Sequence, residues 1–286
     1  MITRIILTTI LCAAAVAGCS ENGGSEDSSG TTRVVAGFYP LAFAAEEVGD
    51  ESVEVTNLTP AGAEPHDLEL TPRELETILG ADLVVYLGEG FQPAVEEAVE
   101  GADVAAIDAL EGLELEAGGA GVDPHVWLDP VRFAEVVERI GTALGRDVKA
   151  RELASRLRAL DEKLREGLGD CDRRELVTAH DAFRYFADRY RLEVIPITGL
   201  APEAEPTPQD LEAIASLVRD RGVTTVFTET LLSPELGETV AREAGATTAV
   251  LNPLEGLTEE EVARGEDYFS VMETNLDELR DGLGCR

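Results

Sequence analysis

The three histidines of this 286-residue chain are the residues whose type and setting best suit chemistry. His66 stands in Glu-Pro-His-Asp, His125 in Asp-Pro-His-Val-Trp-Leu-Asp and His180 in Ala-His-Asp-Ala-Phe. Each follows a predicted strand or lies in a tight Asp/Pro turn. Neutral imidazole binds zinc at about 2.0–2.1 Å, and three imidazoles with one further ligand complete a tetrahedron. A single histidine is more often structural, but three in similar settings, with none elsewhere, predict one shared transition-metal site.

We expect the metal to be Zn²⁺. Manganese prefers harder oxygen ligands, usually with carboxylates among them, and fits these residues less well. The fourth ligand is left open. We place Asn252 in the site because it directly follows a predicted strand, while water and several carboxylates are alternatives: Glu64, Asp67, Asp181 and Glu255. Asp123 and Asp129 flank His125 and can orient its ring without touching the metal.

The elements that must position these residues alternate along the chain. From residue 33 onwards, short apolar runs such as 83–87 are followed by helical segments, which predicts parallel sheets with helices on both faces. Thr71-Pro72 and Thr207-Pro208 have the cap-plus-proline pattern of helix starts. Apolar residues three or four apart over 148–168 predict a long helix, with Val148 in its apolar stripe.

These patterns divide the chain into two α/β lobes of similar make. Ligands in open α/β sheets bind beyond the carboxyl ends of the strands, so facing lobes would hold the metal in the cleft between them. Lobe movement would then suit capture and release. The predicted parts are a signal peptide at 1–18, a lipidated cysteine and flexible tether at 19–32, an N-terminal lobe at 33–145, a connecting helix at 146–170 and a C-terminal lobe at 171–286.

The N-terminus has the pattern of a targeting segment. Residues 5–17 form an uncharged run that is too short to span a membrane, which takes about 20 residues, but suits a signal peptide. The run ends in Val-Ala-Gly-Cys19, which resembles the lipobox of bacterial lipoproteins and implies lipidation of Cys19. An ordinary signal peptide or a short anchor is the alternative. Residues 20–32 are rich in Ser, Gly and Glu and predict a flexible tether.

The remaining cysteines form a pair. Cys12 lies in the predicted signal peptide, so Cys171 and Cys285 are left in an oxidising compartment, where we expect them to form a disulfide. The bridge would stabilise the fold by about 4–5 kcal/mol on the chain-entropy model. A metal site built on these cysteines is the alternative, but no local Cys-x-x-Cys spacing supports it.

The charge of the chain restricts its partners. With 57 acidic and 23 basic residues, the formal net charge is −34. This charge argues against nucleic acid and against an anionic membrane surface as direct partners. Because the acidic residues are spread along the chain, a solvated surface explains most of them.

Three motifs, in order, resemble those of the zinc/manganese-type solute-binding proteins of ABC transporters. They are Ala-Gly-Ala-Glu-Pro-His-Asp at 61–67, Asp-Pro-His-Val-Trp-Leu-Asp-Pro at 123–130 and His-Asp-Ala-Phe at 180–183. The resemblance implies two α/β lobes joined by one rigid helix, with the metal between them. It further implies a lipid-anchored, extracytoplasmic monomer, on the outer membrane face or in the periplasm, that delivers zinc to an ABC permease and its ATPase and is not an enzyme.

The chain departs from that family pattern at three places. Asn252 stands where many relatives have Asp, so the fourth ligand is in question. Residues 112–121 contain no histidine, although zinc members often carry a His-rich loop there. Arg184 stands where a small residue is expected. His180 is present where manganese members often have Glu, which favours zinc.

Two other classes of function compete with this interpretation. A three-histidine zinc hydrolase or hydratase would hold an activated water at an open fourth position, but no base-plus-oxyanion arrangement is recognisable. An adhesin, or a binding protein for an organic solute such as a siderophore, is the second class. Organic-solute sites are usually lined with aromatic residues, whose share here is only 5%.

Overall fold

The structure, a computed structural model, describes residues 31–118, 121–202 and 206–286. Residues 31–286 belong to one compact unit. The predicted signal peptide, the lipidation site Cys19 and nearly all of the tether lie outside the described residues. In the described part of the chain, no helix combines the length and apolar character needed to cross a bilayer.

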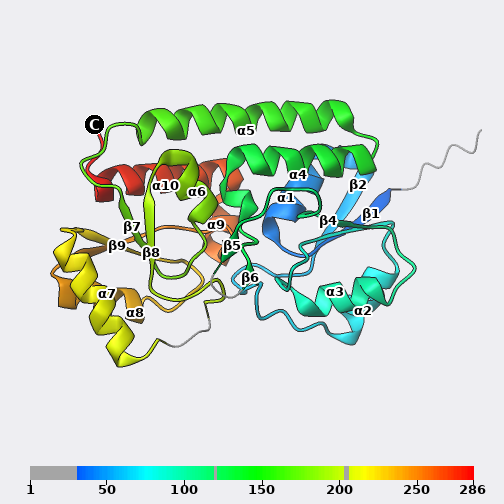
Figure 1. Ribbon diagram of the computed structural model, residues 1–286. Coiled ribbons are helices and arrows are strands. Elements are labelled where there is room, and N and C mark those ends of the chain that lie inside the picture. Colours follow the sequence, from blue (N-terminus) through cyan, green and yellow to red (C-terminus); the bar gives the residue numbers. More distant parts are fainter. Residues whose placement is uncertain (1–30, 119–120, 203–205) are drawn as a thin grey trace, which may run out of the picture. The chain divides into compact units, whose positions relative to one another are not determined.

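The first half of the unit, on the right in Figure 1, contains a parallel four-stranded sheet with the order β2-β1-β3-β4. Successive side chains of β1 and β3 are buried in different cores, so both faces of the sheet are covered by helices, as expected for parallel sheets. The strands are β1 (Thr32–Ala36), β2 (Val53–Asn57), β3 (Leu83–Tyr86) and β4 (Ala106–Asp108), and the helices between them are α1 (Tyr39–Gly49), the 3₁₀ turn η1 (Asp50–Ser52), α2 (Pro72–Leu79) and α3 (Pro93–Glu100).

The second half repeats this arrangement. Its sheet has the order β10-β9-β7-β8, so that, numbered within each half, both sheets have the order 2-1-3-4. The strands are β7 (Glu175–Thr178), β8 (Glu193–Pro196), β9 (Thr225–Thr228) and β10 (Thr247–Val250), and the helices are α6 (Arg184–Tyr190), α7 (Pro208–Asp220), α8 (Glu235–Ala244), α9 (Glu259–Arg264) and α10 (Tyr268–Leu283). The predicted fold class, two parallel sheets flanked by helices, is confirmed.

The connection between the halves contains the long helix that was expected. A short antiparallel pair, β5 (Ala117–Gly118) and β6 (Gly121–Val122), precedes η2 (Val126–Leu128), α4 (Pro130–Ala143) and α5 (Asp147–Gly167). The prediction for Val148 was wrong, because this residue is 63% exposed. Val148 lies two residues before the buried Ala150, which places it about 200° around the helix from the packed face.

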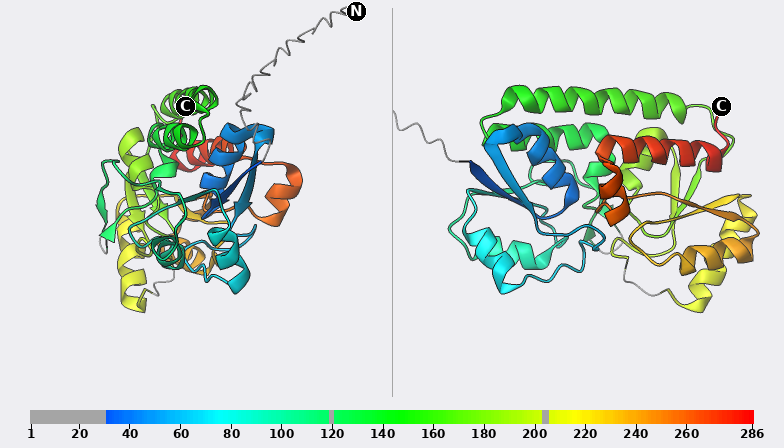
Figure 2. Two further views of the ribbon diagram at one scale, coloured as in Figure 1. Left: turned by 90° about the vertical axis from the view of Figure 1, so that its right-hand side faces the viewer. Right: turned by 180° about the vertical axis from the view of Figure 1, so that it is seen from behind.

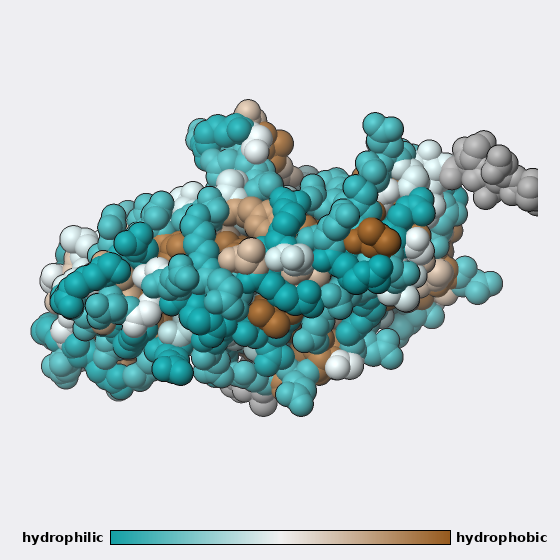
Figure 3. All heavy atoms as spheres, turned by 90° about the horizontal axis from the view of Figure 1, so that it is seen from above, coloured by the Kyte–Doolittle hydropathy of each residue, from teal (hydrophilic) through white to brown (hydrophobic). Residues whose placement is uncertain are grey.

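One hydrophobic core extends through both halves. It contains residues of β1, α1, α4, α5, α6 and α10, and α10 packs against α5 (Figure 2). Separate smaller cores lie between the first sheet and α2 and α3, and between the second sheet and α7 and α8. Viewed from the side of α5, the surface is mostly hydrophilic with scattered apolar side chains (Figure 3). The shared core means that the two sheets are not independent bodies joined by a bare helix.

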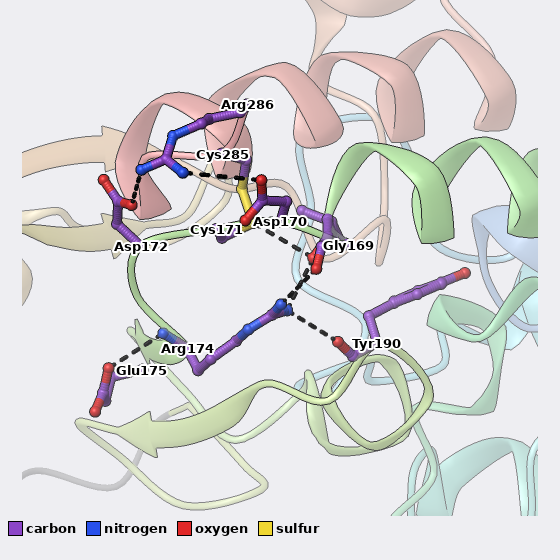
Figure 4. Close-up of a disulfide and its surroundings, with 10 residues drawn as sticks. Gly169, Asp170, Cys171, Asp172, Arg174, Glu175, Tyr190, Cys285 and Arg286 are labelled. Atoms are coloured by element: carbon purple, nitrogen blue, oxygen red, sulfur yellow. Dashed lines mark hydrogen bonds and ion pairs between the residues drawn. A yellow bond between two sulfur atoms is a disulfide. The ribbon is translucent and has the colours of Figure 1, made fainter.

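The ends of the second half are tied together by covalent and polar contacts. Cys171 and Cys285 form the disulfide expected from the sequence (Figure 4). Arg174 donates to the carbonyls of Leu168 and Gly169, which lie just beyond the last residue of α5. The C-terminal segment after α10 is therefore fixed to the segment that leaves α5.

Candidate metal centre

Four side chains from distant parts of the chain meet at one point. The ligand atoms of His66, His125, His180 and Glu255 all lie within 4.8 Å of one another. Oε1 of Glu255 lies 3.3 Å from Nε2 of His66, 3.2 Å from Nε2 of His125 and 3.1 Å from Nε2 of His180. The Nε2 atoms of His125 and His180 are 3.3 Å apart. The three predicted histidines therefore do converge.

Four of the six distances within this group, at 3.1–3.3 Å, match the edges of a zinc tetrahedron. Four atoms at about 2.0–2.1 Å from a central ion lie roughly 3.3–3.4 Å from one another. In neutral histidines whose Nδ1 carries the proton, each Nε2 presents a lone pair, as does the carboxylate. Four lone pairs directed at one point repel each other, and a cation at that point removes the repulsion. The geometry is thus suited to a metal ion, and three imidazoles with one carboxylate favour zinc.

His66 reaches the site from the long loop between β2 and α2. Its backbone N–H donates to Glu64, and its ring packs edge-on against Phe91 at 4.5 Å between centroids. The loop meets the second half through the N–H of Gly62, which donates to the carbonyl of Leu257 at 2.9 Å. Gly62 has φ +80°, a left-handed conformation that favours glycine. The His66 side chain retains 9% exposure, the largest of the four.

His125 belongs to the first half by sequence but is held by the second. The indole N–H of Trp127 donates to the carbonyl of Pro253 at 2.8 Å, and the hydroxyl of Tyr268 donates to the Trp127 carbonyl at 2.6 Å. The hydroxyl of Tyr185 donates to the Asp123 carbonyl at 2.9 Å. These contacts fix the buried His125 segment against α6, α10 and the loop after β10.

His180 lies two residues after the end of β7, at the place where the strand order of the second sheet reverses. Ligands in open α/β sheets bind at such a switch point. Glu229 follows the neighbouring strand β9, and its Oε2 accepts from Nδ1 of His180 at 2.7 Å. Sequence reasoning missed Glu229, although its position immediately after a predicted strand is the same signal that identified His180.

Glu255, not Asn252, completes the group of four. Oδ1 of Asn252 accepts from the backbone N–H of Leu254 at 2.7 Å, and its amide nitrogen donates to Glu261 at 3.0 Å. Leu254 has φ +57°, a conformation that is unusual for a side-chain-bearing residue. Asn252 thus stabilises the turn at Leu254, and this turn directs the side chain of Glu255 toward the imidazoles.

The other candidate carboxylates have different partners. Asp129 caps α4 and pairs with Arg189, and the buried Asp181 pairs with Arg184. This ion pair accounts for Arg184, for which the sequence offered no reason. Asp67 is exposed, and Glu64 accepts a hydrogen bond from the His66 backbone N–H.

The electrostatics of the site favour positive charge. Burial lowers the pKa of His125, but hydrogen bonds to Asp123 and Glu255 outweigh it and leave the pKa above the ordinary value. Burial acts in the same way on His180, where the charges of Glu255 and Glu229 raise the pKa well above that value. Burial raises the pKa of Glu255, but the charge of His180 and hydrogen bonds from the imidazoles hold it well below the ordinary range. The carboxylates around the imidazoles therefore favour positive charge at this point.

Comparison with known proteins agrees with this geometry. The profile of the family described as ZnuA, zinc-uptake complex component A, periplasmic, matches residues 34–282. The chain is 32% identical over 297 residues to the high-affinity zinc uptake system protein ZnuA of Bacillus subtilis, covering 94% of this chain and 93% of that protein. It is 34% identical over 302 residues to the zinc-binding lipoprotein AdcA of Streptococcus pneumoniae, covering 96% of this chain but only 60% of AdcA.

Solved structures show the same similarity. The Zn(II)-bound ZnuA-like domain of S. pneumoniae AdcA superposes with a TM-score of 0.78 and 35% identity, covering 89% of this chain and 99% of that one. The laminin-binding protein Lmb of Streptococcus agalactiae, described as bifunctional with adhesin and metal transporting activity, gives 0.81 and 28%, with 89% and 99% coverage. The chain therefore belongs to the ZnuA family of zinc-uptake complex component A proteins.

Proposed function

We propose that this chain captures one Zn²⁺ through His66, His125, His180 and Glu255 and delivers it to an ABC permease for import. The observation that carries the proposal is that one carboxylate oxygen lies 3.1–3.3 Å from three Nε2 atoms, which is the spacing between ligands in a zinc tetrahedron. Two relatives support zinc as the transported ion, because one is named a zinc uptake system protein and the other a zinc-binding lipoprotein.

The site suits binding better than catalysis. A catalytic zinc keeps one coordination position open for water or substrate, whereas structural sites are closed by four protein ligands. Here four protein ligands are available, and three of them are almost completely buried. We infer that the protein is not a zinc hydrolase or hydratase. Manganese would bind less well, because only one of the four ligands is an oxygen donor.

The proposed division into two lobes and a membrane anchor is consistent with this role. We propose lobes at 33–145 and 171–286 connected by the helix at 146–170, with Cys19 as a lipid anchor that keeps the monomer on the outer side of the membrane. The shared core limits how far the lobes separate. Release to the permease and its ATPase would then involve a local movement at the metal ligands rather than full separation of the lobes.

Equilibrium titration with zinc in competition with a chelator tests the proposal. The wild-type protein should bind one Zn²⁺ tightly and discriminate against Mn²⁺. His125→Ala should lose most of the affinity while the far-ultraviolet circular dichroism stays unchanged. In cells deprived of zinc, deletion of the gene should slow growth and uptake of radioactive zinc, and His125→Ala should fail to restore either. Wild-type affinity in His125→Ala, or zinc uptake that does not depend on the protein, would overturn the proposal.

A further inference from the structure

Two of the three imidazoles are held by carboxylates on the side away from the metal ligand atoms. Nδ1 of His125 donates to Oδ1 of Asp123 at 2.7 Å, and Nδ1 of His180 donates to Oε2 of Glu229 at 2.7 Å. The same carboxylates accept the backbone N–H groups of these histidines, in both cases at 3.0 Å. Each carboxylate therefore fixes both the backbone and the ring of one histidine.

This arrangement determines which ring nitrogen is available to a metal. An ionised carboxylate only accepts hydrogen bonds, so Nδ1 must carry a proton, and Nε2 of the neutral ring then presents its lone pair to the cluster. His66 differs. Its backbone N–H is accepted by Glu64, but no hydrogen bond joins its Nδ1 to another group in the described part of the chain.

Neither carboxylate forms a salt bridge with an arginine or a lysine in the described part of the chain. The side chains of Asp123 and Glu229 are 0% and 1% exposed, and among the described residues their only ion-pair partners are His125 and His180. No hydrogen bond from the residues that the structure describes reaches Oδ2 of Asp123. Burying a carboxylate without an arginine or lysine is costly. A role in holding the metal-binding imidazoles would explain why the protein buries these two carboxylates despite the unfavourable free energy.

We propose that Asp123 and Glu229 are positioning residues that hold His125 and His180 as Nε2 ligands, whereas His66 is an adjustable ligand without such a support. This inference rests on the proposed zinc site, because it concerns the same histidines. Carboxylates that hold metal-binding histidines in this way typically contribute 10–100-fold to metal affinity.

Glu229→Gln and Asp123→Asn test the proposal. Each keeps the size of the side chain, but the new amide can donate to Nδ1 and so favour the tautomer with the proton on Nε2, which cannot bind metal. Zinc affinity should fall by about 10–100-fold in each variant. Glu238→Gln and Asp220→Asn, which remove the same charge at exposed positions on α8 and α7, should stay within twofold of wild type. Unchanged affinity in both test variants would overturn the proposal.

Nuclear magnetic resonance of protein labelled with ¹⁵N-histidine gives a readout that affinity alone does not. The chain has three histidines, so three imidazoles are observed. In metal-free and zinc-loaded wild type, the Nδ1–H protons of His125 and His180 should exchange slowly with water, and that of His66 quickly. Each variant should lose the slow signal of its own histidine. Retention of both slow signals in the variants would refute the tautomer argument even if affinity fell.

These outcomes separate the two proposals. If wild type binds no zinc, the proposed function fails, but the slow Nδ1–H signals of the metal-free protein still test the positioning role. If one variant does not fold, the other tests the same role independently, because Asp123 follows β6 and Glu229 follows β9.

Discussion

Replacing Glu255 by glutamine tests the assignment of the fourth ligand. Its Oε1 lies 3.1–3.3 Å from the Nε2 atoms of all three imidazoles. Glutamine keeps the volume but removes the charge. A carboxylate that only supports a ligand ring contributes about 10–100-fold in affinity. One that binds the ion itself should contribute more, so we expect Glu255→Gln to weaken zinc binding at least about 100-fold, roughly 2.8 kcal/mol.

Asn252→Ala gives the contrasting result. The substitution removes the acceptor of the Leu254 N–H and the donor to Glu261, both of which are buried. Each unsatisfied buried group costs about 1–3 kcal/mol, so the free energy of unfolding should fall by roughly 2–6 kcal/mol. Zinc affinity should fall less than in Glu255→Gln, because the turn is loosened but the carboxylate ligand remains.

Competition with a fluorescent chelator measures both affinities, and urea denaturation of the metal-free variants measures stability. Glu259→Gln, an exposed carboxylate at the start of α9, controls for loss of one negative charge and should bind zinc as wild type does. Glu255 is not the fourth ligand if Glu255→Gln binds zinc within fivefold of wild type, or if a folded Asn252→Ala loses more zinc affinity than Glu255→Gln.

Further predictions concern pH, the disulfide and fluorescence. Because the pKa values of His125 and His180 are raised without metal, protons compete with zinc for these imidazoles already above pH 6.5. Zinc affinity should therefore fall as the pH drops. Zinc titrations that give the same affinity from about pH 7 to 5 would contradict this expectation. Replacing Cys171 and Cys285 by serine should lower the free energy of unfolding by up to about 4–5 kcal/mol in urea, with zinc affinity within twofold of wild type, because the bridge lies beyond the C-terminal end of α10. Zinc should change the emission of Trp127, whose ring lies 5.1 Å from that of His125; stoichiometric zinc binding without a spectral change would contradict this placement.

Local signals in the sequence were sufficient for most of the fold. Thr71 and Thr207 form capping boxes at the starts of α2 and α7, as their patterns predicted, because such caps depend on residues three apart. The same signal at Thr258 marks α9, which was not predicted although Glu261 completes the box. The β5–β6 pair was missed because two-residue strands in a Gly-rich loop leave too few positions for an alternating pattern.

The metal centre was predictable only in part. The settings of His66, His125 and His180 after strands or in turns were sufficient to group them. The choice between Asn252 and Glu255 was not, since both follow β10 and the outcome depends on the left-handed conformation of Leu254, which a leucine does not signal.

The position of His125 in the sequence does not indicate which half of the fold holds it. His125 precedes the connecting helix in sequence, yet contacts of Trp127 with Pro253 and Tyr268 bind its segment to the second half. Contacts between residues more than 100 positions apart leave no local pattern in the chain.

X-ray absorption spectroscopy of the zinc-loaded protein tests whether three histidines and one glutamate bind the same ion, because it reports the atoms bound to the metal. We expect one zinc with three imidazole nitrogens and one carboxylate oxygen at about 2.0–2.1 Å, and no sulfur. A shell with fewer than three imidazoles, a sulfur ligand or six oxygen ligands would contradict it.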